Sequence, residues 1–327
     1  MSASLSTVRF GAIAFPFGGE ITLSTAVAAF CGGVFGAAIG GLLSFVIMGF
    51  LVAAGVLIAI TGGGAGFLSD VAWGSVFGPH IGLLGGAVAA AYAYRRGYYR
   101  DGRRIDIALV TLKRWDVLLV GGLTGVCGYL LVTVLDVIPV LGNHLDSIAV
   151  TIALILFLAR LAFGRTGLSN NRVAKTSNLF YKAQFWLPYQ NSWLAVIGQG
   201  AIAAGIAAVV TSLLVTLLPQ AAEVVHELPF AISSFLLLGL LFGAVIPVTH
   251  HITLPAATAA ALVMALPRIG AQNRWGLSLF AGIIVGIIGA CLGEIFARLW
   301  LIDGDTLIDP PALTNAVLLT VMSVAAG

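Results

Sequence analysis

The tetrapeptide His80-Ile81-Gly82-Leu83 returns as His251-Ile252-Thr253-Leu254 in the second half of the chain. Hydrophobic sequence long enough to cross a bilayer as helices surrounds both copies. Each copy follows residues that interrupt a helix, Gly78-Pro79 in the first half and Pro247-Val248-Thr249 in the second. A duplicated hydrophobic unit with a histidine at matching positions is typical of membrane transporters and channels.

The composition predicts a protein solvated by lipid. Of the 327 residues, 60% are hydrophobic and 9% are charged, whereas soluble domains carry roughly 25% charged residues. The apolar runs are continuous, which indicates helices. We therefore predict an all-α integral membrane protein that crosses the plasma membrane several times. A net charge of +3 is too small to indicate nucleic acid as a partner.

Ten hydrophobic elements are expected, five in each half. Tryptophans near their ends, such as Trp73 and Trp115, are expected in the aromatic belts at the membrane surface. The elements predicted in the first half are 22–48, 57–77, 80–94, 115–135 and 143–163. Those predicted in the second half are 193–218, 229–248, 252–266, 275–299 and 309–325.

Several matched positions beyond the histidines predict a duplication. Arg114-Trp115 corresponds to Arg274-Trp275, and Asp146 corresponds to Asp309, in the same order along the two halves. Two homologous membrane repeats are therefore expected, residues 1–168 and 183–327, in one compact membrane domain. A polar cytoplasmic linker, 169–182, joins them.

The direction of the repeats remains open in the sequence. If all five elements of each half span the membrane, the second repeat is inverted and the lysines and arginines divide 13 inside to 3 outside. If the third element of each half is re-entrant, four elements span, the repeats are parallel and the division is 15 to 1. The charge rule slightly favours parallel repeats, but inverted five-element repeats are a recurrent transporter architecture. We favour inversion.

The matched polar residues form the predicted substrate or ion pathway. His80 and His251 each open a short element after a helix break, and His250 stands beside the second. A neutral imidazole there could relay a proton or bind a polar solute, although capping a helix in an interfacial turn would also explain it. Asp146 and Asp309 are expected to line a central site and also to cap the helices that follow them.

Neutral polar groups accompany these residues in the second half. They could hydrogen-bond a small polar solute, or they could only bond neighbouring helices. These residues are Thr249, Thr253, Thr314 and Asn315.

The sequence favours a secondary transporter or channel for a small polar solute or ion. No metal-binding or phosphate-binding motif accompanies these residues, so no metal, cofactor or enzymatic activity is predicted. A membrane subunit of a larger transport complex is the first alternative, and an intramembrane enzyme that uses His–Asp pairs is the second. The expected partners are the solute and the lipid bilayer, and a homo-oligomer is compatible with the sequence.

Overall fold

The computed structural model describes residues 21–139, 141–168, 185–267 and 270–326 of the chain. These residues form helices and loops, and no β-strand occurs among them, which confirms the predicted all-α class. The helices of the first half are α1 (Leu23–Ile39), α2 (Gly41–Ile60), α3 (Gly82–Arg95), α4 (Trp115–Val137), α5 (Leu141–His144) and α6 (Ser147–Phe163). The second half contains α8 (Trp193–Leu217), α9 (Glu227–Phe235), α10 (Leu238–Leu241), α11 (His250–Met264), α12 (Ala271–Phe296) and α13 (Pro310–Ala326).

Four helices are long and apolar enough to cross a membrane. They are α2, α4, α8 and α12, the last continued by the π-helical turn Ala297–Leu301. The helices α1, α6 and α13 are apolar but shorter, at 17 residues each. Many large side chains on the long helices are exposed, for example Leu123 on α4, Ile202 on α8 and Phe280 on α12.

The three main helices of each half pack closely through small residues. In the first half α1 contacts both α3 and α4, and Gly33 of α1 lies directly against the backbones of Gly85 and Gly121. In the second half α8 contacts α11 and α12 in the same way, with Gly286 of α12 against Ala204 of α8. Residues without bulky side chains allow this close approach of helix backbones.

Two pairs of helices join the halves. Helix α2 packs against α9, and α6 packs against α13. The first pair is aromatic, since Phe50 stacks on Phe235 with ring centres 4.7 Å apart. The second pair includes a polar contact of 3.2 Å between His144 Nδ1 and Ser323 Oγ.

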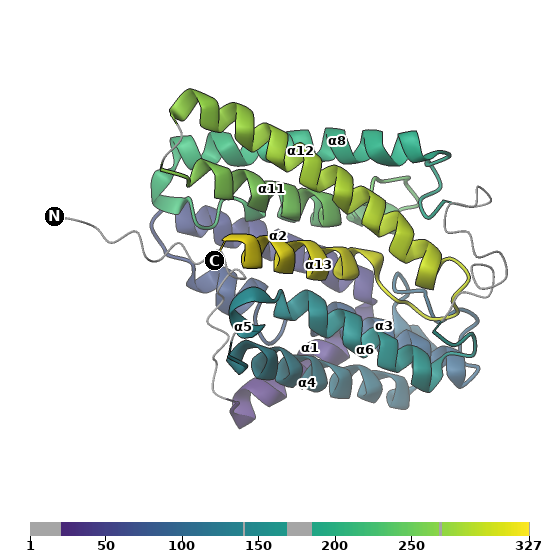
Figure 1. Cartoon of the computed structure of the whole chain (residues 1–327). Helices are drawn as coiled ribbons and strands as arrows, with labels where there is room; N and C mark the ends of the chain where they lie inside the picture. The colour runs from purple at the N-terminus through teal and green to yellow at the C-terminus, as the bar shows by residue number, and fades with distance from the viewer. Residues whose placement is uncertain (1–20, 140, 169–184, 268–269, 327) are drawn as a thin grey trace.

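The contacts at the two ends of α6 and α13 give the relative direction of these two helices (Figure 1). His144, just before α6, contacts Ser323 near the end of α13. At its other end α6 carries Arg160, which contacts Thr306 just before α13 begins. Helices α6 and α13 are therefore antiparallel. Both termini of the described chain lie at the same end of the bundle as α5 (Figure 1).

Two predicted boundaries in the first half are wrong. The element predicted at 22–48 is interrupted at Gly40, which adopts a φ of 95°. Only glycine adopts such an angle readily, and the turn is held where Leu42 N donates to Ile105 O at 2.9 Å. The element predicted at 57–77 is largely loop, because α2 ends at Ile60 and only a π-helical turn, Leu68–Ala72, follows.

In the second half the element predicted at 229–248 is also too long. Helices α9 and α10 end at Leu241, and Gly243 has a φ of 76° that favours leaving the helix. The remaining predicted elements lie within four residues of the observed helices. The predicted linker, 169–182, lies outside the described residues.

Candidate functional site

Both repeated histidines are buried deep between helices. His80 precedes α3 and is 1% exposed, and His251 is the second residue of α11 and is 2% exposed. The backbone carbonyl of His80 lies against Gly128 of α4, about 20 Å from the start of that helix at 1.5 Å per residue. The carbonyl of His251 lies against Gly289 of α12. The two histidine turns therefore lie inside the bundle, not in surface loops.

His250 lies at the interface between the halves. Its ring centre is 5.0 Å from that of Phe45 on α2 and 6.3 Å from that of Phe230 on α9. The side chain is 7% exposed, and its Nδ1 has no hydrogen-bond partner among the described residues. His251 instead faces its own half, where it packs against Trp186 with ring centres 5.5 Å apart.

A carboxylate is buried at the same interface. Glu227, the first residue of α9, is 0% exposed, and the Trp73 side chain is close enough to influence its carboxylate. Asp146 lies within electrostatic reach of it. Trp73, which the sequence placed in a surface aromatic belt, is 4% exposed and stacks on Phe230 at 5.4 Å, so that prediction is wrong for this residue.

We call these residues the interface cluster: two from the first half and three from the second, namely Phe45, Trp73, Glu227, Phe230 and His250. The sequence identified only His250 among them. The weak sequence signal for Glu227 is its place immediately before an apolar run, where a helix starts favourably with an acidic residue. No group of three or more histidine, cysteine or carboxylate side chains suitable for a metal ion occurs in the described part of the chain.

Asp146 and Asp309 cap helices, and they do so at opposite ends of the bundle. Ala149 N donates to Asp146 Oδ1 at 2.9 Å, and Ala312 N donates to Asp309 Oδ2 at 3.0 Å. Because α6 and α13 are antiparallel and each has 17 residues, the two carboxylates lie about 20 Å apart by helix length. The structure does not bring the two carboxylates together, because the helices they cap run in opposite directions.

The neutral polar residues of the second half mostly bond within the protein. Thr253 and Ser233 share a hydrogen bond of 2.8 Å between α11 and α9, and the Thr314 hydroxyl donates to Pro310 O at 2.9 Å. The Thr249 carbonyl accepts the first backbone bonds of α11. Asn315 is 7% exposed, and its Oδ1 has no partner among the described residues.

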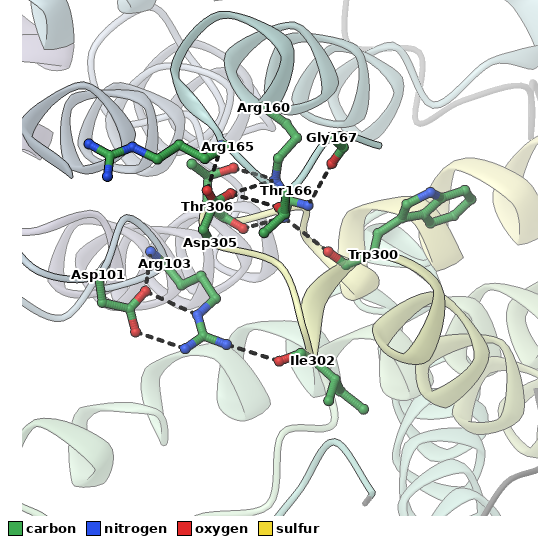
Figure 2. A network of polar contacts seen from close by, with 10 residues as sticks. All are labelled: Asp101, Arg103, Arg160, Arg165, Thr166, Gly167, Trp300, Ile302, Asp305 and Thr306. Atoms are coloured by element: carbon green, nitrogen blue, oxygen red, sulfur yellow. Dashed lines mark hydrogen bonds and ion pairs between the residues drawn. The ribbon is translucent and has the colours of Figure 1, made fainter. Parts of the chain in front are cut away.

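A polar network joins the halves at the end of the bundle opposite α5 (Figure 2). Arg160 on α6 is 2% exposed, and it donates to Trp300 O at 2.9 Å and to both the hydroxyl and the carbonyl of Thr306. Its Nε is 3.7 Å from Asp305 Oδ1. Arg103, from the loop between α3 and α4, donates to Ile302 O at 3.1 Å. These contacts hold the turn before α13 against the first half.

Carboxylates in the loop between α3 and α4 are held ionised. Hydrogen bonds from Arg104 to Asp106, at 2.7 Å, lower the pKa of Asp106 below its usual value. At Asp101 burial acts to raise the pKa, but hydrogen bonds from Arg103 outweigh it, so that its pKa is also lowered. This end of the bundle is therefore rich in paired charges.

One family model matches the chain twice, over residues 17–176 and again over 165–327. The family is described as a family of unknown function, DUF7973. No curated protein and no solved structure matches the chain significantly.

Proposed function

The chain belongs to this family of unknown function, and we propose that it is a plasma-membrane transporter or channel built from two inverted repeats. It moves a small polar solute or ion along the interface between the repeats. The observation that carries the proposal is the burial of ionisable side chains, Glu227 and His250, where the halves meet. Ionisable groups inside a membrane protein are costly and mark pathways for solutes or protons.

The membrane location is supported by the outer surface. The four long helices present exposed large apolar side chains, which water would solvate poorly and lipid solvates well. Their lengths, 20 to 29 residues, match the roughly 20 residues that cross the hydrocarbon core.

The repeats are supported by the double family match and by equivalent packing. The α1–α3–α4 group in the first half and the α8–α11–α12 group in the second each consist of three helices that all contact one another. The α2–α9 and α6–α13 pairs are the contacts that a two-fold axis would make between equivalent helices. Inversion is supported by the antiparallel course of α6 and α13, since parallel repeats would place these two helices in the same direction.

The distribution of basic residues between the two ends of the bundle also supports inversion. Arg103 and Arg160 lie at the end of the bundle that holds the polar network (Figure 2), and Arg104 directly follows Arg103 in the chain. By the positive-inside rule this end is cytoplasmic, and both chain termini lie outside. A fluorescent or enzymatic reporter fused at the C-terminus tests this arrangement: activity on the external side is expected, and a cytoplasmic reporter would favour parallel repeats.

Transport is tested with the purified chain in proteoliposomes. Swelling in neutral solutes such as urea and glycerol, and entrapped pyranine for proton movement, should show flux above that of protein-free vesicles. The variant His250→Leu should reduce this flux, whereas Thr258→Val, on the same helix with its hydroxyl bonded to Leu254 O, should not. Wild-type flux equal to that of empty vesicles for every solute would overturn the proposal.

A further inference from the structure

We propose that Glu227 is the proton-binding group of the interface cluster, which alternates between carboxylate and neutral carboxylic acid as transport proceeds. This inference rests on the proposed transport function and names its coupling ion. No redox or bond-breaking step is involved, because Glu227 takes up one proton at a carboxylate oxygen and later releases the same proton to water.

The geometry leaves the charge of Glu227 uncompensated. Its side chain is 0% exposed, and none of the described lysines or arginines forms an ion pair with it. The other buried glutamate provides the contrast: Glu294 Oε1 accepts from Arg298 at 2.6 Å. An isolated buried carboxylate is costly, and it avoids that cost by taking up a proton.

The neighbours of Glu227 supply hydrogen-bonding groups but no fixed positive charge. The Trp73 indole, whose N–H is a donor, lies near it, and Phe230 lies three residues further along α9, on the same face. The Phe230 ring borders both Trp73 and His250. The buried Nδ1 of His250, which lacks a partner among the described residues, places a second proton acceptor on the same aromatic wall.

The titratable groups around Glu227 come from few elements. Asp146, at the start of α6, is close enough to interact electrostatically, and two like charges at short range disfavour full ionisation of both. The preceding His226 is 6% exposed and bonds to the Glu223 backbone. His250 and His251 are contributed by α11, while α2 and α8, which also contact α9, contain no ionisable residue.

A metal cation fits this position poorly. Calcium and magnesium are held by several oxygen ligands, whereas the Trp73 indole near the Glu227 carboxylate offers an N–H donor. The described part of the chain contains no cluster of three ligating side chains. A proton needs only the carboxylate itself.

Infrared difference spectroscopy of the full chain in proteoliposomes tests the assignment directly. A carboxylic-acid C=O band should appear on acidification of the wild type, should be lost in Glu227→Gln and should persist in Glu223→Gln, whose carboxylate is exposed. Trp73→Phe should shift the band, because it removes the polar indole N–H near the carboxylate. Glu227→Asp should retain a band at a changed frequency. These two variants keep the test decisive if Glu227→Gln does not fold.

The outcomes separate the two proposals. An identical band set in the wild type and Glu227→Gln, or an unchanged band in Glu227→Asp, overturns the proton assignment even if the protein carries flux. Loss of the band in Glu227→Gln together with wild-type vesicles that transport nothing overturns the transport function and leaves the proton site standing. If both proposals hold, proton movement reported by pyranine is lost in Glu227→Gln and retained in Glu223→Gln.

Discussion

Replacing the buried Arg160 with methionine should cost more stability than any other single charge removal at the polar network. Methionine fills much of the space of the arginine stem but donates no hydrogen bond. The change therefore leaves the Trp300 carbonyl and the Thr306 carbonyl and hydroxyl without their donor. It also removes the positive charge 3.7 Å from Asp305.

The magnitude follows from the burial of these groups. Each buried acceptor left without a partner costs about 1–3 kcal/mol, and breaking one side of a buried ion pair costs about 3–5 kcal/mol in total. Asp305 keeps a hydrogen bond of 2.8 Å from the Thr166 hydroxyl, which limits the loss. We therefore expect Arg160→Met to lower the free energy of unfolding by about 3 kcal/mol.

Arg104→Met is the matched control. Arg104 pairs with Asp106 at 2.7 Å, but its side chain is 47% exposed, and exposed pairs contribute roughly 0–1 kcal/mol. Unfolding of both variants is followed by far-ultraviolet circular dichroism in mixed micelles of increasing sodium dodecyl sulfate content. If Arg160→Met is no more destabilised than Arg104→Met, the network in Figure 2 does not hold the halves together as argued.

Three further changes have defined outcomes. Gly33→Ala should destabilise the bundle by about 1–3 kcal/mol, because its added methyl group would collide with the backbone of α4. Gly276→Ala is the control, because open space surrounds that position and no loss of stability is expected. Thermal unfolding in detergent compares the two variants. Asp309→Ala should cost about 1 kcal/mol through loss of the α13 cap, measured in the same assay. Arg104 lowers the pKa of Asp106. The stabilising contribution of Asp106 is therefore complete above its unfolded-state pKa and lost as the pH falls through its folded-state pKa. The melting temperature of Asp106→Asn should approach that of the wild type in acid, and a difference that stays constant with pH would contradict this.

The sequence predicted the long helices of the second half well because their apolar runs end at clear polar or proline signals. Helix α8 begins after Ser192, which caps it through a bond of 3.2 Å to Ala195 N. The first half lacked such a signal at Gly40, since small and apolar residues continue on both sides. The carbonyls of Ile105 and Ile107 lie 3.0 Å from the position that a Cβ of Gly40 would take, so the chain passes close to this loop at the break. The loop is distant in sequence, and the residues around Gly40 give no sign of it.

Contacts between residues that are distant in sequence also explain why the candidate site was predicted only in part. Repetition indicated the histidines, but repetition carries no information on which side chains they meet. Glu227 meets Trp73, which is more than a hundred residues earlier, and His250 meets Phe45, which is further still. The packing of elements from the two halves, α9 against α2 and α11 against α9, brings Glu227, Trp73, His250 and Phe45 together.

The two helices that pack together at the interface cluster, α2 and α9, differ in their ionisable residues, and this difference bears on the mechanism. Ser233 on α9 contacts Thr253 on α11, and Ser44 on α2 occupies the matching place against Gly82 of α3. Helix α2, which packs against α9, contains no ionisable residue, so Glu227 has no carboxylate counterpart on that helix.

If the proposed transport function holds, the interface has one proton-binding carboxylate, Glu227, and not a symmetric pair. In the proposed transport cycle, the end of the bundle held by Arg160 has to open when the cluster is exposed to the cytoplasm. The contacts that stabilise the fold at this end are then the contacts that oppose access. Arg160→Met should consequently lower the free energy of unfolding while it increases the initial rate of pyranine-reported proton entry from that side. A variant that lost stability and flux together would place the opening elsewhere in the bundle.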